Sequence, residues 1–482
     1  MKNRRSTLPP AVLAVLALAA LAAAAAFARA AGPEPSAGFR AALETLARTA
    51  RETNGAYETI RGLTDTVGAR LSGSAADARA VAWAEATLRA QGFANVHTEA
   101  VTVPHWERGE ESGALVLPSP MRLALCALGG SVGTPPGGLE ADVVEAQSLD
   151  AVDALGEKAK GKIVLVWKVM ERKSDGSGYG ATVPIRGAAA SRAAKVGAVG
   201  ALIRSVGTSN ARFPHTGALR YDEAAPKIPA AALAIPDADQ IHRLLASGAR
   251  VRVRFSLGAR TLPDAPSANV VGEIPGRGKP EEIVLLGGHL DSWDLGTGAI
   301  DDGAGLGIVI EAARLVGQLP RGPRRTLRVV AFANEENGLA GGRAYAAAHA
   351  AELQRHVAAI ESDSGAGRVS GFGWSAGPSA EAYLLSVATI LKPFGLGETK
   401  KGAGGADIGP LRAAGVPLFS PIQDTARYFD LHHTADDTFD KIDREELNTG
   451  VAAMAALAYA LADSEAPLER IPEAERAQRR ER

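Results

Sequence analysis

Two histidines and several acidic residues lie in short motifs whose spacing is typical of metal-binding sites. The first motif holds His289 and Asp291, directly after an apolar segment (283–286) that is expected to form a strand. A neutral imidazole is a common zinc ligand. Because side chains two residues apart in extended chain point the same way, Asp291 could accept the other ring N–H and orient the imidazole. The alternative is a core histidine paired with a local carboxylate.

Two pairs of adjacent acidic residues form the next candidate positions. Asp301 and Asp302 precede a predicted helix, where acidic side chains also cap helices, an alternative that suits Asp302. Glu335 and Glu336 follow the apolar segment 327–333, and two carboxylates there are costly unless they are paired or bind a metal. One of them could bind a metal while its neighbour holds the attacking water. The alternative is an exposed acidic turn.

The last two motifs add a carboxylate and a histidine pair. Asp363 follows another short apolar segment (357–360), and His432 and His433 are adjacent in a polar stretch near the C-terminus. One of the two histidines could be a ligand and the other a packing or substrate residue. The alternatives, for each motif taken singly, are a solvated acidic turn around Asp363 and a polar loop around the histidines. Taken together, the motifs supply two histidines and several carboxylates, most of them at equivalent strand ends. That set suits two zinc ions bridged by one carboxylate and one water.

The elements that must position these residues are strands alternating with helices. This alternation predicts a mostly parallel sheet with helices on both faces. The candidate ligands then fall at the carboxyl ends of the strands, where open α/β sheets bind ligands. The predicted strands are 282–287, 327–333, 357–360 and 417–420, and the predicted helices are 304–315, 339–351, 380–391 and 444–461.

The N-terminus has the features of an export signal. A positively charged start is followed by an apolar run (11–27) and by the small-x-small sequence Ala28-Arg29-Ala30. The alternative is an uncleaved membrane anchor, since the run approaches spanning length. We expect a signal peptide at 1–30 and an exported protein, periplasmic or secreted, without stable membrane insertion after cleavage.

The mature chain is expected to contain one core domain interrupted by an insert. Short apolar runs broken by Gly and Pro predict a small α/β or β-rich insert, and Pro263, Pro266 and Ser267 are predicted to form the linker that follows it. The charged tail is expected to extend into solvent. The predicted regions are 37–112 for the first part of the core, 113–259 for the insert, 260–464 for the main part and 465–482 for the tail.

Composition excludes some classes of function. The formal net charge is -1 and no basic stripe is present, which argues against a nucleic-acid partner. Cys126 is the only cysteine, so no intrachain disulfide can form, and we expect it to be a buried, small apolar residue.

With these motifs in view, the chain resembles the M28 family of metallopeptidases. The resemblance extends beyond the acidic motifs to Arg70-Leu71-Ser72-Gly73-Ser74, to 103–112 and to Pro214-His215-Thr216-Gly217. It implies a phosphorylase/hydrolase-like zinc peptidase core, an inserted protease-associated domain, a homodimer and activity on small unblocked peptides, mainly dipeptides. The implied metal ligands are His289, Asp301 (bridging), Glu336, Asp363 and His433, with Glu335 as the general base and Asp291 in support.

The expected reaction is peptide hydrolysis. Water between two zinc ions is acidified toward a pKa of ~7, and Glu335 would take its proton and pass a proton to the leaving amine. Asp407 lies in a segment that resembles a segment near the active site of M28 peptidases, so it could contact a substrate amine or cap a turn.

Several alternatives to a dipeptidase remain open. Ser375 lies in a Gly-x-Ser-x-Gly sequence like the nucleophile elbow of serine hydrolases, but the Gly-rich residues before it are predicted to be a loop, which argues against that role. An aminopeptidase acting on longer peptides and a single-zinc acyltransferase are further enzyme alternatives. A non-catalytic binding protein is expected to have lost metal ligands or the base, and here every expected position is filled.

Overall fold

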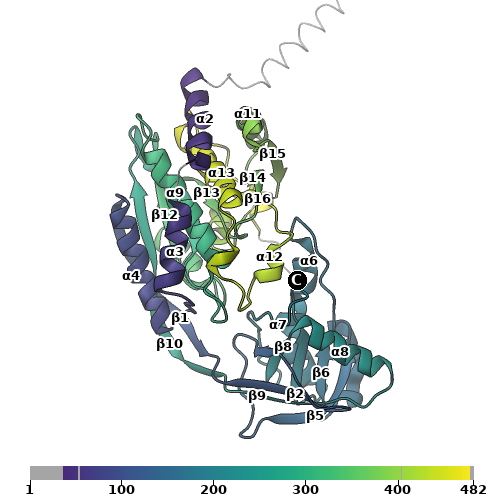
Figure 1. The fold of residues 1–482 in the computed structure, drawn as a ribbon. Coiled ribbons are helices and arrows are strands. Elements are labelled where there is room, and N and C mark those ends of the chain that lie inside the picture. The colour runs from purple at the N-terminus through teal and green to yellow at the C-terminus, as the bar shows by residue number, and fades with distance from the viewer. Residues whose placement is uncertain (1–35, 53–54, 403, 478–482) are drawn as a thin grey trace, which may run out of the picture.

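The computed structural model describes residues 36–52, 55–402 and 404–477, which form two large sheets, each with its own helices (Figure 1). One sheet lies in the upper part of the view and the other in the lower part. The predicted signal peptide, residues 1–30, lies outside the described ranges. Within those ranges, no helix is both long enough and apolar enough to cross a membrane.

The first sheet is parallel at its centre and antiparallel towards its edges. Its strands, in spatial order, are β1 (Ala94–Glu107), β10 (Arg260–Ile274), β12 (Arg325–Phe332), β11 (Lys279–His289), β13 (His356–Glu361), β16 (Leu418–Gln423), β14 (Val369–Ser375) and β15 (Glu398–Lys401). The central pairs are parallel, whereas β1, β10 and β14 pair antiparallel with their neighbours, apart from the parallel β14–β15 pair. The prediction of a mostly parallel sheet is correct for the four central strands and wrong for the edges. The connection between β13 and β14, residues 362–368, contains no helix, so it cannot make the crossover that would bring β14 into the sheet parallel to β13.

Helices cover both faces of this sheet, as predicted. Successive residues of β11 point to opposite faces. Val284 and Leu286 belong to the larger apolar core, whereas Leu285 packs with Tyr345 on the other face. The larger core includes residues of α2 (Ala37–Glu52), α3 (Ala56–Thr66), α4 (Ala75–Ala90), α9 (Ala304–Gly317), α11 (Ser379–Leu391) and α13 (Arg444–Asp463), and Tyr345 lies in α10 (Ala340–Ala348).

The second sheet is built between β2 and β9, within the region predicted as an insert. Its order is β3 (Met121–Arg122), β2 (Glu111–Leu117), β9 (Arg252–Leu257), β5 (Leu139–Ala146), β6 (Ile163–Val166), β7 (Gly200–Arg204), β8 (Ala230–Leu233) and β4 (Leu125–Ala127). Its helices are α5 (Leu149–Leu155), α6 (Ser177–Thr182), α7 (Pro184–Lys195) and α8 (Ile235–Ala246). Alternate residues of β6 enter apolar clusters on opposite faces. Cys126 is buried, as expected, and burial raises the pKa of its thiol to about 12.

A two-stranded ribbon, β1 with β10, leads from the first sheet towards the second (Figure 1). The prediction of a linker at Pro263 and Pro266 is wrong, because both prolines lie inside β10. Only Val270–Ile274 of β10 pairs with β12, so the prolines lie where β10 has β1 as its single partner. Proline has no backbone N–H to donate, and a strand with a single partner tolerates this without losing hydrogen bonds from its ladder.

The charged tail is held against the core as far as it is described. Arg470 donates to the carbonyl of Leu353 at 2.9 Å, and Ile471 is buried. A short helix, α14 (Glu473–Arg476), follows. The expectation that this tail extends into solvent is therefore wrong for residues 465–477, because one apolar side chain and several backbone bonds fix it.

Candidate metal centre

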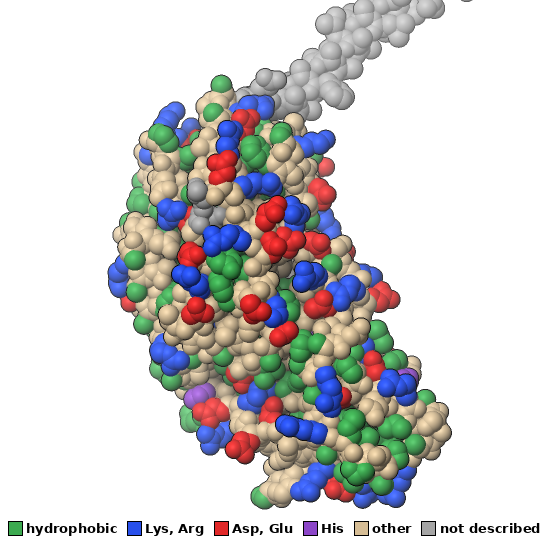
Figure 2. Space-filling model, viewed as in Figure 1, with side chains coloured by type: hydrophobic (Ala, Val, Ile, Leu, Met, Phe, Trp, Pro, Cys, Tyr) green, Lys and Arg blue, Asp and Glu red, His purple; other side chains and the backbone are tan. Residues whose placement is uncertain are grey.

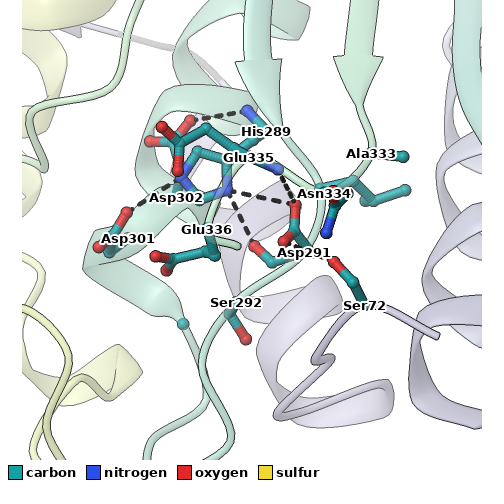
Figure 3. A network of polar contacts seen from close by, with 12 residues as sticks. Ser72, His289, Asp291, Ser292, Asp301, Asp302, Ala333, Asn334, Glu335 and Glu336 are labelled. Atoms are coloured by element: carbon teal, nitrogen blue, oxygen red, sulfur yellow. Dashed lines mark hydrogen bonds and ion pairs between the residues drawn. The ribbon is translucent and has the colours of Figure 1, made fainter. Parts of the chain in front are cut away.

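The predicted ligands come together at the carboxyl edge of the central strands. His289 is the last residue of β11 and lies opposite Phe332, the last residue of β12, while Gly287 lies opposite Glu361 at the end of β13. The residues that follow these strand ends therefore converge. Figure 3 shows His289, Asp301, Asp302, Glu335 and Glu336 around one small region.

Asp301 joins two groups of ligands. Its Oδ1 lies 3.0 Å from Nε2 of His289, and its Oδ2 lies 3.2 Å from Nε2 of His433. Asp363 Oδ1 is 3.8 Å from Nε2 of His289, and Glu336 Oε2 is 2.9 Å from Nε2 of His433. The first group is thus His289, Asp301 and Asp363, and the second is Asp301, Glu336 and His433.

These separations fit a metal centre. Ligand atoms that share one tetrahedral zinc at 2.0–2.1 Å lie roughly 3.3 Å apart. Three sets of donor atoms each lie within 4.8 Å of one another: those of His289, Asp301 and Glu336, those of His289, Asp302 and Asp363, and those of Asp301, His432 and His433. Glu336 Oε1 has no hydrogen-bond partner, although its side chain is only 4% exposed. A buried carboxylate oxygen without a partner is costly, and a bound cation would satisfy it.

Electrostatics favours cations at the same place. Burial and the like charge of nearby acids, Asp301 among them, raise the pKa of Asp363 to about 7. Burial and the charge of Asp363 raise the pKa of Glu335 well above its usual value. Burial lowers the pKa of His433, but the charge of Glu336 and the hydrogen bond that His433 donates to Asp301 outweigh it and raise that pKa to about 9. Divalent cations placed here would offset the repulsion among the carboxylates.

Of the two late histidines, His433 is the better placed ligand. Its Nε2 reaches both Asp301 and Glu336, and its Nδ1 lies 3.3 Å from the carbonyl of Thr216, which orients the ring. His432 stacks on it with ring centroids 3.5 Å apart, and His432 Nε2 is 3.5 Å from Asp301 Oδ2. This geometry supports the ligand role that the resemblance implied for His433.

Asp302 and Asp437 hold the backbone of the site. Asp302 accepts from the backbone N–H of His289 at 3.1 Å and of Gly305 at 3.0 Å, so the predicted capping role of Asp302 is confirmed. Asp437 accepts from the N–H of Ile300 at 2.6 Å and of Asp301 at 3.2 Å. The two carboxylates thereby fix the positions of two candidate ligands, His289 and Asp301.

Asp291 lies beside His289 but makes different contacts from those predicted. The Nδ1 of His289 lies 3.0 Å from the backbone carbonyl of Asp291 and 3.8 Å from its carboxylate. The carboxylate accepts instead from the N–H of Glu335 at 2.9 Å and from the hydroxyl of Ser72 at 2.8 Å (Figure 3). Asp291 therefore orients the imidazole through its main chain and holds the Glu335 backbone through its side chain.

A buried arginine fixes the loop between His289 and Asp301. Arg70 is fully buried and donates to the carbonyls of Leu290, Thr297 (2.7 Å) and Gly298 (2.9 Å). Replacing Arg70 with methionine is expected to lower the free energy of unfolding by roughly 3 kcal/mol or more, because each buried carbonyl left without a donor costs about 1–3 kcal/mol. Urea unfolding measures this change.

The matched control for Arg70 is the exposed Arg79 of α4. Arg79→Met is expected to change the free energy of unfolding by less than about 0.5 kcal/mol. Equal destabilisation by the two variants would contradict a special role for Arg70.

Ser375 lies at the amino ends of the central parallel strands, whereas the metal ligands lie at their carboxyl ends. The expectation of a loop before it is wrong, because β14 ends at Ser375. Gly371 lies so close to the Glu398 carbonyl that a Cβ there would be 1.9 Å away, so glycine is required in this strand and weakens its sequence signal. Since β14 runs antiparallel to β16, with Ser375 opposite Leu418, its carboxyl end points away from His433. This direction argues against a Ser375–His433 catalytic pair.

Several residues that shape the site were not predicted to be functional. Arg70 and Ser72 were singled out only by the family resemblance, and no role was predicted for Asp437. The insert also reaches the site: Thr216 donates its N–H to the His433 carbonyl at 2.9 Å, and Arg186 lies 3.3 Å from His433 Nδ1. Nothing in the local spacing of these residues could reveal contacts with residues more than 100 positions away.

Known proteins match both the sequence and the fold. The profile of peptidase family M28 matches residues 269–469. Mouse carboxypeptidase Q is 39% identical over 89% of this chain and 90% of its own length, and human carboxypeptidase Q is 38% identical over the same shares. The crystal structure of a peptidase M28 precursor from Shewanella amazonensis has a TM-score of 0.88 and 43% identity, covering 90% of this chain and 99% of that chain.

More distant structures share the fold. A zinc aminopeptidase from Bacillus subtilis has a TM-score of 0.63 at 22% identity and covers 86% of this chain and 98% of its own. The extended identity to carboxypeptidase Q, the family profile and the shared fold lead to one conclusion. This chain belongs to peptidase family M28 and is a metallopeptidase.

Proposed function

We propose that this protein is a two-zinc exopeptidase that hydrolyses small unblocked peptides, above all dipeptides. The observation that carries the proposal is the position of Asp301, which presents one carboxylate oxygen to His289 and the other to His433. His289 and Asp363 would complete one zinc site, and Glu336 and His433 the other. Bound zinc would supply Lewis acidity, which lowers the pKa of water and polarises the peptide carbonyl.

Glu335 is the proposed general base. It would accept a proton from the attacking water as the new C–O bond forms, and would return a proton to the amine as the C–N bond breaks. Asp291 supports this role, because its carboxylate accepts from the Glu335 N–H at 2.9 Å and thereby fixes the loop that carries the base.

Asp407 is the proposed partner of the substrate's free amino group. Both of its carboxylate oxygens lack a hydrogen-bond partner, although the residue is only 1% exposed. Burial, together with the charges of Glu361, Asp291 and Asp363, raises the pKa of Asp407 well above its usual value. An ammonium group would satisfy this oxygen pair and offset the excess negative charge.

The remaining parts of the proposal concern organisation. We propose that the insert is a protease-associated domain, that residues 1–30 direct export, and that the enzyme works as a homodimer. The family resemblance supports the insert and the dimer, and the charged and apolar pattern of the N-terminus supports export.

The test is hydrolysis of a panel of substrates by the zinc-loaded protein, with chelator and with zinc added back. The panel contains unblocked dipeptides, their N-acetylated forms and tetrapeptides. We expect rapid cleavage of the unblocked dipeptides only, lost with chelator and restored by zinc. Preferred release of the N-terminal residue from tetrapeptides would indicate an aminopeptidase instead. Cleavage that resists chelation would contradict the proposed mechanism, and no cleavage of any peptide would favour a binding protein.

A further inference from the structure

The segment that carries His433, residues 424–433, is held by the insert. It includes α12 (Tyr428–Leu431), which lies beside α6 of the insert (Figure 1). Phe429 of α12 belongs to an apolar cluster of the insert, and its ring stacks on that of Tyr179 with centroids 4.8 Å apart. The N–H of Thr208 donates to the Phe429 carbonyl at 3.0 Å. A proposed ligand of the core domain is thus carried by a segment that packs against the insert.

The backbone conformation of His433 needs support from its surroundings. Its φ is 62°, in the left-handed region that is unfavourable for a residue with a Cβ. Such a residue is strained and keeps its conformation only where surrounding contacts fix it. The contacts to His432 and His433 therefore determine where the His433 imidazole points.

Two adjacent residues of the insert make these contacts. Nδ1 of His215 lies 2.9 Å from the carbonyl oxygen of His432, the residue directly before the ligand. The N–H of Thr216 donates to the His433 carbonyl at 2.9 Å, and the Thr216 carbonyl lies 3.3 Å from His433 Nδ1. The insert thus holds the backbone on both sides of His433, and its ring as well.

His215 is firmly placed within the insert. It is 1% exposed, and its backbone N–H donates to Ser205 Oγ at 2.9 Å. A Cβ on Gly207 would lie 2.2 Å from Cε1 of the ring, so the imidazole packs directly on this glycine. Because Nδ1 faces a carbonyl oxygen, it carries the proton and donates. Among the described residues, Nε2 has no hydrogen-bond partner, so the contact with His432 depends on Nδ1 alone.

We propose that His215 is a positioning residue for the metal centre: its Nδ1–H fixes the peptide before His433 and thereby aims that imidazole at its zinc site. The other zinc site uses His289 at the end of β11 and Asp363 after β13, which the first sheet positions. Loss of the His215 contact should therefore weaken the binding of one ion and spare the other. This inference rests on the proposed two-zinc function.

The experiment exchanges His215 for asparagine and for glutamine. The amide nitrogen of asparagine takes the place of Nδ1 and can donate to the same carbonyl, whereas glutamine places its amide near Nε2. After zinc loading and dialysis, wild type and His215→Asn should hold two ions per chain. His215→Gln should hold one, because losing a contact behind a ligand lowers metal affinity roughly 10- to 100-fold. Atomic spectroscopy measures zinc content, and titration with cobalt, followed by visible absorption, should show one site unchanged and one weakened.

A double variant identifies the affected ion. His433→Ala removes one proposed ligand and should leave one ion bound. If His215 acts through His433, adding His215→Gln to this variant should lower zinc affinity no further, because the effects of two changes in one network of contacts are not additive. A further loss of affinity in the double variant would contradict the role.

A matched control and a second variant separate this role from a general effect on folding. His242, another histidine of the insert, pairs with Glu145 at 2.9 Å, and His242→Gln should keep both ions. Arg172 of the insert holds the same segment as His215 by pairing with Asp430 at 2.6 Å, and its side chain is 45% exposed. Arg172→Met should therefore fold and weaken the same ion by a smaller factor.

The outcomes distinguish this role from the proposed function. If wild type and His215→Gln both hold two ions with equal affinity, the positioning role is wrong, while the two-zinc function stands. The role is also wrong if the glutamine variant loses both ions, or if the asparagine and glutamine variants behave alike. Should His215→Gln fail to fold, unchanged zinc affinity in Arg172→Met would overturn the role. If zinc-loaded wild type holds fewer than two ions, the proposed two-zinc function itself fails, and this role fails with it.

Discussion

Replacing Glu335 with glutamine is expected to lower kcat for dipeptide hydrolysis by roughly 10²- to 10⁴-fold, the usual contribution of a positioned general base. Glutamine keeps the shape of the side chain but cannot accept the proton of the attacking water. The Glu335 backbone is held by Asp291, so the loop should keep its position in the variant. Steady-state kinetics with an unblocked dipeptide measures the change.

The Glu335 result is informative only if metal remains bound. Zinc content, measured by atomic spectroscopy after dialysis, should match wild type, because Glu335 is not among the proposed ligands. Glu445→Gln, a change at a side chain that is 87% exposed, provides the matched control and should leave kcat unchanged. Retained turnover in the Glu335 variant would remove this residue from the role of base.

Replacing Asp301 with alanine is expected to lower zinc affinity and turnover more than replacing any other single ligand, because the two oxygens of Asp301 face His289 and His433 separately. Loss of the bridge removes a ligand from both proposed ions at once. We expect zinc affinity to fall by far more than the roughly 10- to 100-fold typical of changes around the ligands, and turnover to fall to background. Zinc titration and dipeptide hydrolysis measure the two effects.

Thermal unfolding adds a second readout for Asp301. A metal that binds only the folded state raises stability, so wild type should melt at a higher temperature with zinc than with chelator. Asp301→Ala should show little of this difference. Asp440→Ala, at an exposed acid after the histidine pair, is the control and should behave like wild type. A variant at Asp301 that keeps both ions would contradict the bridging assignment.

The central elements and most proposed ligands could be predicted from the sequence. The strands β11, β12, β13 and β16 and the helices between them follow from runs of apolar residues, since burial on both faces dictates composition locally. His289 is the last residue of β11, and Glu335 and Asp363 lie within three residues of the ends of β12 and β13. Because carboxyl ends of adjacent parallel strands share one edge, chain position alone predicts that these side chains meet.

The edges of the sheet were not predictable in the same way. Glycines at 371 and 373 hide β14, and prolines at 263 and 266 suggest a break inside β10. In both cases the pairing partner decides the outcome: Glu398 leaves no room for a side chain at Gly371, and β10 lacks a second neighbour at its prolines. The strand propensity of a segment does not depend on the strand that pairs with it from a distant part of the chain.

The alternation of strands and helices, the types of ligand and their places after strands all follow from residue types and spacing. Which of these groups face each other depends on how the elements pack. In the folded protein, the two oxygens of Asp301 face different histidines, and the carboxylate of Asp291 accepts from the Glu335 backbone. Arg186 of the insert lies against His433. The physical reason is the separation of these residues along the chain. Periodicity reflects burial within one element, whereas these contacts join elements that meet only when both sheets are folded and packed.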